Sequence, residues 1–234
     1  MGHTFGKNST RTSSAGNPIT TASFAIVEGE TVLAALLKTV GATDRAGGAL
    51  TFAGLTLTQA NSTQKAASSP EAGAELWYLL NPPIGSWTAT IPNTNAATIF
   101  YTLATGKAAL GGRSAFDTAN GGNATSTNPT PGAVTVSEAG EILFAITAGG
   151  WQTWAPSSQA GTIIANTDDG AHGGGEQYAL PALGSFTLNW TFGTSDDWGA
   201  VVAAFKEVPP PTLENYKFAR SASTGIISVT EKIR

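Results

Sequence analysis

Short apolar runs, separated by turn residues, recur along most of this chain. The clearest lies at residues 50–58, where apolar residues alternate with threonine on either side of Ala53 and Gly54. This period of two predicts a β-hairpin with one solvated face. The same reasoning predicts further strands over residues 22–27, 31–40, 75–80, 87–91, 98–103, 134–136, 141–147, 161–165, 186–192 and 200–205.

One of these runs leaves its secondary structure open. Residues 31–40 are rich in alanine and leucine, which also favour a short helix. No segment shows a convincing helical period, and turn residues punctuate the runs at short intervals. We therefore predict an all-β fold, an antiparallel two-sheet β-sandwich with jelly-roll topology. Trp77, Trp87 and Trp190 fall inside predicted strands and are expected in the core.

Polar stretches flank and interrupt the predicted body. Residues 1–22 contain few large apolar side chains and cannot offset the entropy of ordering alone, so they predict a flexible arm. Residues 105–132 are rich in glycine, asparagine, threonine and proline, which predicts a long loop. Three prolines at 209–211 end the body at 23–208 and stiffen the start of a second arm, 209–234.

A last apolar run lies beyond the three prolines. Residues 225–230 predict one more strand, which the proline spacer carries away from the core. An extended strand of this kind can add to the edge of a sheet in another protein, where main-chain hydrogen bonds hold it. We therefore expect the partner of this strand to be another chain.

The charge of the chain divides between the body and the arms. Residues 23–208 hold six basic and fourteen acidic residues, which gives the body a net charge of −8. The first arm carries two basic residues without an acid, and the second carries four basic residues against two acids, so each arm is +2. Arms opposite in charge to the body indicate attachment to an acidic partner, rather than turnover of a substrate.

Composition excludes several classes of protein. The chain has no cysteine, so it has no disulfide framework. No run approaches the roughly 20 apolar residues of a membrane helix, and the N-terminus lacks the apolar core of a signal peptide. We expect a protein made in a cytoplasm, without a membrane partner. The acidic body offers no concentrated basic face, which argues against nucleic acid as a partner.

Candidate catalytic residues are few. His172 and Glu176 share a glycine-rich stretch that suits a catalytic pair or a metal, but such stretches often carry charged residues for solvation alone. Glu71 and Glu75 would lie about 13 Å apart on an extended strand, at about 3.3 Å per residue, which is too far for glycosidase chemistry. We therefore predict neither catalysis nor a cofactor.

Two binding alternatives remain open. Adjacent acids can contribute oxygen ligands to calcium, and the two such pairs are Asp168 with Asp169 and Asp196 with Asp197. Solvated surface acids are the commoner explanation for such pairs. Trp151 and Trp154 stand at the start of a predicted loop, where exposed indole rings would suit stacking on a glycan.

Three stretches of the body carry a resemblance to known proteins. Residues 50–59, 75–90 and 198–205 resemble β-sandwich domains of tailed-phage virion structural proteins and of related bacterial surface proteins. The resemblance implies a fold, and that group shares no catalytic signature that can be carried over. The size of the chain, its lack of cysteine and its two arms look more like a virion component, such as a head decoration or cement protein.

The leading hypothesis is therefore a virion structural protein that binds a major capsid protein or another virion protein through its arms. Such a protein would be made in the host cytoplasm and would form a homo-oligomer, a trimer or a dimer. The alternative is a glycan-binding or adhesin-type module. The residues expected to contact a protein partner are Lys7, Arg11, Lys217, Arg220, Ile226, Ile227, Lys232 and Arg234.

Overall fold

The computed structural model contains strands and connecting segments, and no helix, in the part of the chain that it describes. Every strand pairing in that part is antiparallel. The predicted all-β fold of antiparallel sheets is confirmed. The described residues are 8–14, 17–40, 48–65, 72–93, 98–106, 115–137, 141–149, 154–155, 175–179, 183–206, 216–220 and 227–232.

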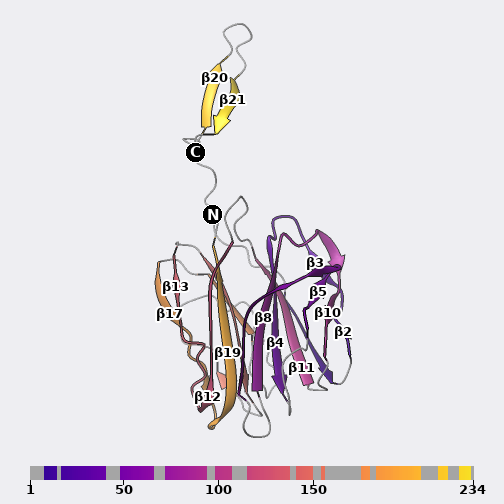
Figure 1. Cartoon of the computed structure of the whole chain (residues 1–234), viewed down its shortest axis with the longest axis vertical. Helices are drawn as coiled ribbons and strands as arrows, with labels where there is room; N and C mark the ends of the chain where they lie inside the picture. Colours follow the sequence, from indigo (N-terminus) through magenta and orange to yellow (C-terminus); the bar gives the residue numbers. More distant parts are fainter. Residues whose placement is uncertain are drawn as a thin grey trace.

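Two large sheets form the middle of the body (Figure 1). The first central sheet has the strand order β1–β11–β4–β8–β7, and the second has the order β12–β19–β14–β16. The strands of the first are β1 (Asn8–Ser14), β4 (Val32–Val40), β7 (Thr58–Lys65), β8 (Ala72–Leu80) and β11 (Thr98–Gly106). Those of the second are β12 (Phe116–Ser126), β14 (Ile142–Gly149), β16 (Gly175–Ala179) and β19 (Asp196–Phe205).

Shorter strands cover the outer face of each central sheet, which gives the body a layered build (Figure 1). Over the first sheet lie β2 (Ile19–Thr20), β3 (Phe24–Ile26), β5 (Thr51–Phe52), β6 (Leu55–Thr56), β9 (Gly85–Trp87) and β10 (Ala89–Ile91). Over the second lie β13 (Ala133–Val136), β15 (Trp154–Ala155), β17 (Gly184–Thr187) and β18 (Thr191–Phe192). The strands in the middle of the central sheets, β4, β14 and β19, are thus buried on both faces, whereas β12 at the edge of the second sheet is half-buried.

Burial on both faces explains the continuous apolar runs in the sequence. Along β4, alternate side chains enter different clusters: Leu36 faces the second central sheet and Leu37 faces the outer strands. A strand covered on two sides has no polar face, so its sequence loses the period of two. Helix propensity within residues 31–40 is overridden here, because only a strand places successive residues in opposite clusters.

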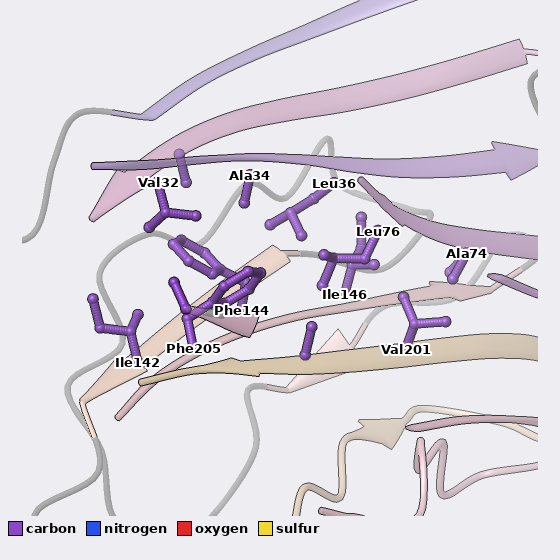
Figure 2. Close-up of a cluster of buried hydrophobic side chains, with 14 of the residues drawn as sticks. Val32, Ala34, Leu36, Ala74, Leu76, Ile142, Phe144, Ile146, Val201 and Phe205 are labelled. Carbon is purple, nitrogen blue, oxygen red and sulfur yellow. The ribbon is translucent and has the colours of Figure 1, made fainter. Parts of the chain in front are cut away.

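The two central sheets meet through a core that mixes small and large side chains (Figure 2). Alanines such as Ala34 and Ala74 allow the sheets to approach, while Phe144 and Phe205 fill the space between them with rings that meet edge to face at 5.7 Å between centroids. Interdigitation of this kind fixes the position of one sheet on the other. The two-sheet sandwich is therefore the centre of the fold.

The jelly-roll topology is not confirmed. A jelly roll draws the strands of both sheets from both halves of the chain. Here all strands of the first central sheet come from residues 8–106, and all described strands of the second come from residues 116–205. Each half of the chain therefore makes one central sheet, together with the outer layer that covers it.

The long loop predicted over residues 105–132 is wrong. Strand β12 occupies Phe116–Ser126 and pairs with β19 along its whole length. Its glycines reflect close packing rather than a turn, since a Cβ on Gly122 would lie 2.5 Å from the carbonyl oxygen of Thr130. Strand pairing with a distant segment outweighed a composition that is typical of loops. The strand predicted at 161–165 lies outside the described residues.

Local turn chemistry was a better guide than composition. The predicted hairpin at residues 50–58 is confirmed by β5 and β6, which are joined by Ala53 and Gly54. Both turn residues have positive φ, 52° and 78°, as a two-residue hairpin turn of type I′ requires. The hairpin forms part of the outer layer over the first central sheet.

The tryptophans divide between core and surface. Trp77 and Trp190 are buried, as predicted. The prediction that Trp87 belongs to the core is wrong, because its side chain is 39% exposed. Strand β9 lies in the outer layer rather than in a central sheet, so it has no second layer above it. The indole Nε1 of Trp87 donates a hydrogen bond to the carbonyl oxygen of Pro83 at 3.0 Å.

The two predicted arms contain regular strands. Residues 8–14 form β1, which pairs with β11, and Ile19 of β2 is buried against the outer layer. The strands of the body therefore begin within residues 1–22. At the other end, β20 (Tyr216–Arg220) and β21 (Ile227–Lys232) form a hairpin apart from the layered body (Figure 1). Within this chain β21 pairs with β20, and its expected pairing with another chain stays a prediction.

Substitution of Gly122 tests the close packing of β12. We expect Gly122→Ala to lower the free energy of unfolding by about 1–3 kcal/mol, because the added methyl group meets a backbone oxygen that cannot move aside cheaply. Gly48→Ala is the matched control, since its Cβ would make an ordinary 3.5 Å contact with Pro92. Urea denaturation measures both. Equal stability of the two variants would contradict this packing.

Candidate functional site

Four of the six predicted contact residues of the second arm, Lys217, Arg220, Ile227 and Lys232, lie on one hairpin. Lys217 lies opposite Glu231, Arg220 lies opposite Ile227, and Lys232 pairs with Tyr216. Arg11 is elsewhere, on β1 in the first central sheet, where it lies opposite Tyr101. The remaining predicted contact residues, Lys7, Ile226 and Arg234, lie outside the described residues.

The residues considered as candidates for glycan, metal or catalytic sites are only partly described. Trp154 lies on β15 and Glu176 on β16. Trp151, Asp168, Asp169, His172 and Glu71 lie outside the described residues. Asp197 is buried and accepts a hydrogen bond from the Thr125 hydroxyl, and Asp196 Oδ1 accepts the Asp197 amide at 2.8 Å. No group of three potential metal ligands occurs among the described residues.

A cluster of charged side chains that the sequence did not suggest lies at one end of the second central sheet. Lys206 Nζ is 2.9 Å from Asp117 Oδ1. Asp117 Oδ2 accepts hydrogen bonds from the Ser137 amide at 3.1 Å and the Ser137 hydroxyl at 3.0 Å. The same Ser137 amide also reaches Glu141 Oε1 at 3.0 Å. We call these four residues, Asp117, Ser137, Glu141 and Lys206, the charged clip.

Local backbone irregularities position the charged clip. The pairing of β12 with β19 shifts between Phe116 and Thr118, which leaves Asp117 as the extra residue of a bulge. Lys206 directly follows β19, and its amide donates to the carbonyl oxygen of Ala115 at 2.7 Å. The bulge and the end of β19 therefore bring a carboxylate and an ammonium group together across the sheet.

The charges of the clip favour the ionised form of Asp117. Burial by itself would raise the pKa of Asp117, but hydrogen bonds from Lys206 and Ser137 and the neighbouring Glu141 outweigh it, so the pKa lies below the ordinary value of 3.8. Glu141 has no exposed surface. Asp117 already accepts from three donors, and Glu141 is buried, so neither carboxylate is open to a ligand. The charged clip therefore connects β12, the segment after β13 and the end of β19.

Other carboxylates of the body are also turned inward. Glu75 is fully buried and accepts the indole N–H of Trp77 at 2.7 Å. Glu30 is buried and accepts the Val27 amide at 2.7 Å and the Thr105 hydroxyl at 2.8 Å. These buried carboxylates satisfy hydrogen-bond donors inside the body and do not contribute charge to its surface. The net charge of the body therefore overstates the charge that the described surface presents.

The described surface carries its large apolar residues mainly on the outer layer over the first central sheet. Ile84 is 65% exposed, Leu55 46% and Val27 44%. The pairing of Ile26 with Gly85 places Val27 next to Ile84 at the end of the β3–β9 ribbon. With the half-exposed ring of Trp87, which lies beside Gly85, Val27 and Ile84 make this end of the ribbon a candidate contact surface.

Comparisons with known proteins add no relative. No family model matches the chain, and neither a curated protein nor a solved structure matches it significantly. The described part of the chain contains no helix that is long and apolar enough to cross a membrane. Function must therefore be argued from the geometry of the surface and from the hairpin.

The charged clip predicts a specific pH dependence of stability. A depressed pKa in the folded state stabilises the protein above the ordinary pKa of Asp117, and this stabilisation is lost as the pH falls through the folded value. We expect Asp117→Asn to lower the free energy of unfolding at neutral pH by about 1–3 kcal/mol, because Lys206 loses its charged partner. The difference from the wild type should shrink below about pH 4.

Urea denaturation at pH 7, 5 and 3 measures this effect. Glu28→Gln is the control, because Glu28 is an exposed carboxylate whose replacement should leave stability nearly unchanged. A loss of stability in Asp117→Asn that stayed the same at all three pH values would show that the clip does not act through the ionisation of Asp117.

Proposed function

We propose that this chain is a virion structural protein, a decoration or cement component that binds a protein lattice through its C-terminal hairpin. The resemblance of residues 50–59, 75–90 and 198–205 to phage β-sandwich domains supports this class. The single observation that carries the mode of attachment is the hairpin formed by β20 and β21, which joins neither central sheet.

An isolated hairpin needs a partner. Two strands alone are marginally stable in water, and among the described residues β20 and β21 pair only with each other. The register places Phe218 opposite Val229 and Arg220 opposite Ile227, so these residues share one face of the hairpin. A face with three apolar residues and one arginine gains stability when it is covered by another protein surface.

Charge indicates the chemistry of that surface. The second arm has a net charge of +2, and Lys217, Arg220 and Lys232 lie on the hairpin itself. Glu30, Glu75, Glu141 and Asp197 of the body are buried, so they cannot serve as external partners for these cations. An acidic patch with an apolar centre on a major capsid protein or another virion protein would complement the hairpin.

Truncation of the chain tests this function. A variant that ends at Val208 should keep the melting temperature of the body, because the hairpin belongs to neither central sheet. The amount of this variant that co-sediments with purified virions, measured by mass spectrometry, should be at least tenfold lower than that of the full chain. Full occupancy of the truncated chain would show that the hairpin is not the anchor, and absence of the full chain from particles would overturn the virion assignment.

A charge-reversed variant separates contact from mere length. Arg220→Glu combined with Lys232→Glu keeps every backbone group of the hairpin while it inverts two charges whose register partners, Ile227 and Tyr216, are uncharged. We expect this variant to lose as much association as the truncated chain does. Reversal of Lys206 is unsuitable as a control, because Lys206 is paired with Asp117 in the charged clip. Glu28→Lys, on the exposed turn after β3, changes the net charge by +2 and shows whether a charge reversal elsewhere on the surface also affects association.

A second candidate function is glycan binding, which the exposure of Trp87 favours. The ring is held in place, because its Nε1 donates to Pro83 and a Cβ on Gly85 would lie only 3.0 Å from that nitrogen. A fixed, half-exposed indole can stack on a sugar ring. On a glycan array, Trp87→Ala should abolish any saccharide signal if this surface binds, and Trp154→Ala should do so if the predicted loop binds instead. No signal from the wild type would remove this candidate.

A further inference from the structure

Strand β1 is an edge strand of the first central sheet, and a single neighbour attaches it to the body, as a single neighbour also attaches β16 to the second central sheet. It pairs with β11 over all seven residues, from Asn8 opposite Ala104 to Ser14 opposite Thr98. Among the described strands, only β11 makes substantial contact with β1. By comparison, the other outermost strand of this sheet, β7, also contacts β12 and β19 of the second central sheet.

The sequence of β1 agrees with a strand held by its backbone. Asn-Ser-Thr-Arg-Thr-Ser-Ser contains no large apolar residue that could anchor it in either neighbouring cluster. The favourable hydrogen bonds of such a ladder and the entropy lost on ordering the strand are of similar size. The net free energy that holds β1 on β11 is therefore small, whereas the buried side chains of β11 fix that strand in the body.

Strand β11, which lies beside β1 in the sheet, could pair with a strand from another chain in place of β1. Ile99, Tyr101 and Leu103 are buried in the cluster under the outer layer, and Thr102 is also buried. Departure of β1 would leave the side chains of β11 anchored in this cluster and would expose the backbone N–H and C=O groups along the edge of β11 that β1 now pairs with. A rigid edge with open hydrogen-bonding groups accepts any strand that matches it in length and direction.

We propose that β1 exchanges between copies of this protein, so that β1 of one copy pairs with β11 of a second copy in the register seen within one chain. The same seven pairs form in both arrangements, so the exchange loses no backbone hydrogen bond and changes only which chain supplies the strand. High local concentration favours the exchanged form, because it removes the entropic cost of bringing two copies together. This inference stands whether or not the protein belongs to a virion.

Engineered cysteines test the exchange without interference, since the chain has no cysteine of its own. Thr10 and Thr102 are register partners, and partners across an antiparallel ladder lie about 4.5–5.5 Å apart, within reach of a disulfide. The single variants Thr10→Cys and Thr102→Cys are mixed under oxidation over a range of protein concentrations. A crosslink between the two variants in excess of random collision requires that β1 of one chain lies on β11 of another.

The matched control replaces the acceptor position. Thr98 lies four residues from Thr102 along β11, about 13 Å away, so Thr10→Cys mixed with Thr98→Cys should not crosslink. We expect at least tenfold more of the disulfide-linked dimer that joins the two different variants in the matched mixture than in the control, with a yield that rises with concentration. A matched yield no higher than the control at every concentration would overturn the proposal.

Two further measurements test the register of β1 on β11 and the need for β1 in the dimer. The double variant with Thr10→Cys and Thr102→Cys in one chain should form an intramolecular disulfide at low concentration, and failure to do so would show that the register itself is wrong. Light scattering on the unmodified full chain should detect a dimer at high concentration that disappears when residues 1–14 are deleted. A dimer that survived this deletion would contradict exchange through β1.

Discussion

The contact between the two central sheets is the constraint on which the rest of the structure depends. Alanines on β4 and β8 let the sheets approach, and Phe144 and Phe205 lock them in position. Strands that are covered on this side must be apolar on this side, and the outer layers then require them to be apolar on the other side too. The outer strands are short, and they supply large side chains such as Phe52 and Phe192 to the clusters on the outer faces of the central sheets.

The sequence predicted features that depend on neighbouring residues and failed where distant segments meet. The hairpin at Ala53 and Gly54 was predictable, since a type I′ turn and the alternation beside it are local signals. Strand β12 was missed because its sequence, rich in glycine and asparagine, is stabilised by pairing with β19 and by the close approach of residue 130. Trp87 was misplaced because periodicity does not reveal whether a strand has one or two covering layers.

For the candidate sites, too, local features were predictable from the sequence and contacts between distant segments were not. The basic residues of the second arm were apparent from the sequence, but only the strand pairing places Lys217, Arg220 and Lys232 on one hairpin. The charged clip joins Asp117 to Lys206 across a bulge that no local pattern marks. Glu75 stood within an apolar run, and that position was the one signal of a buried carboxylate. Sums of charge along the chain could not separate such interior groups from the surface.

The assignment of one central sheet to each half of the chain has a consequence for synthesis. Residues 8–106 leave the ribosome before β14 and β19 exist, so the first sheet can form while its inner face, with Leu36 and Leu76, has nothing to cover it. During that interval the nascent chain exposes a broad apolar surface to other nascent chains and to chaperones. The rate of translation through the second half therefore sets how long each new molecule is exposed to aggregation.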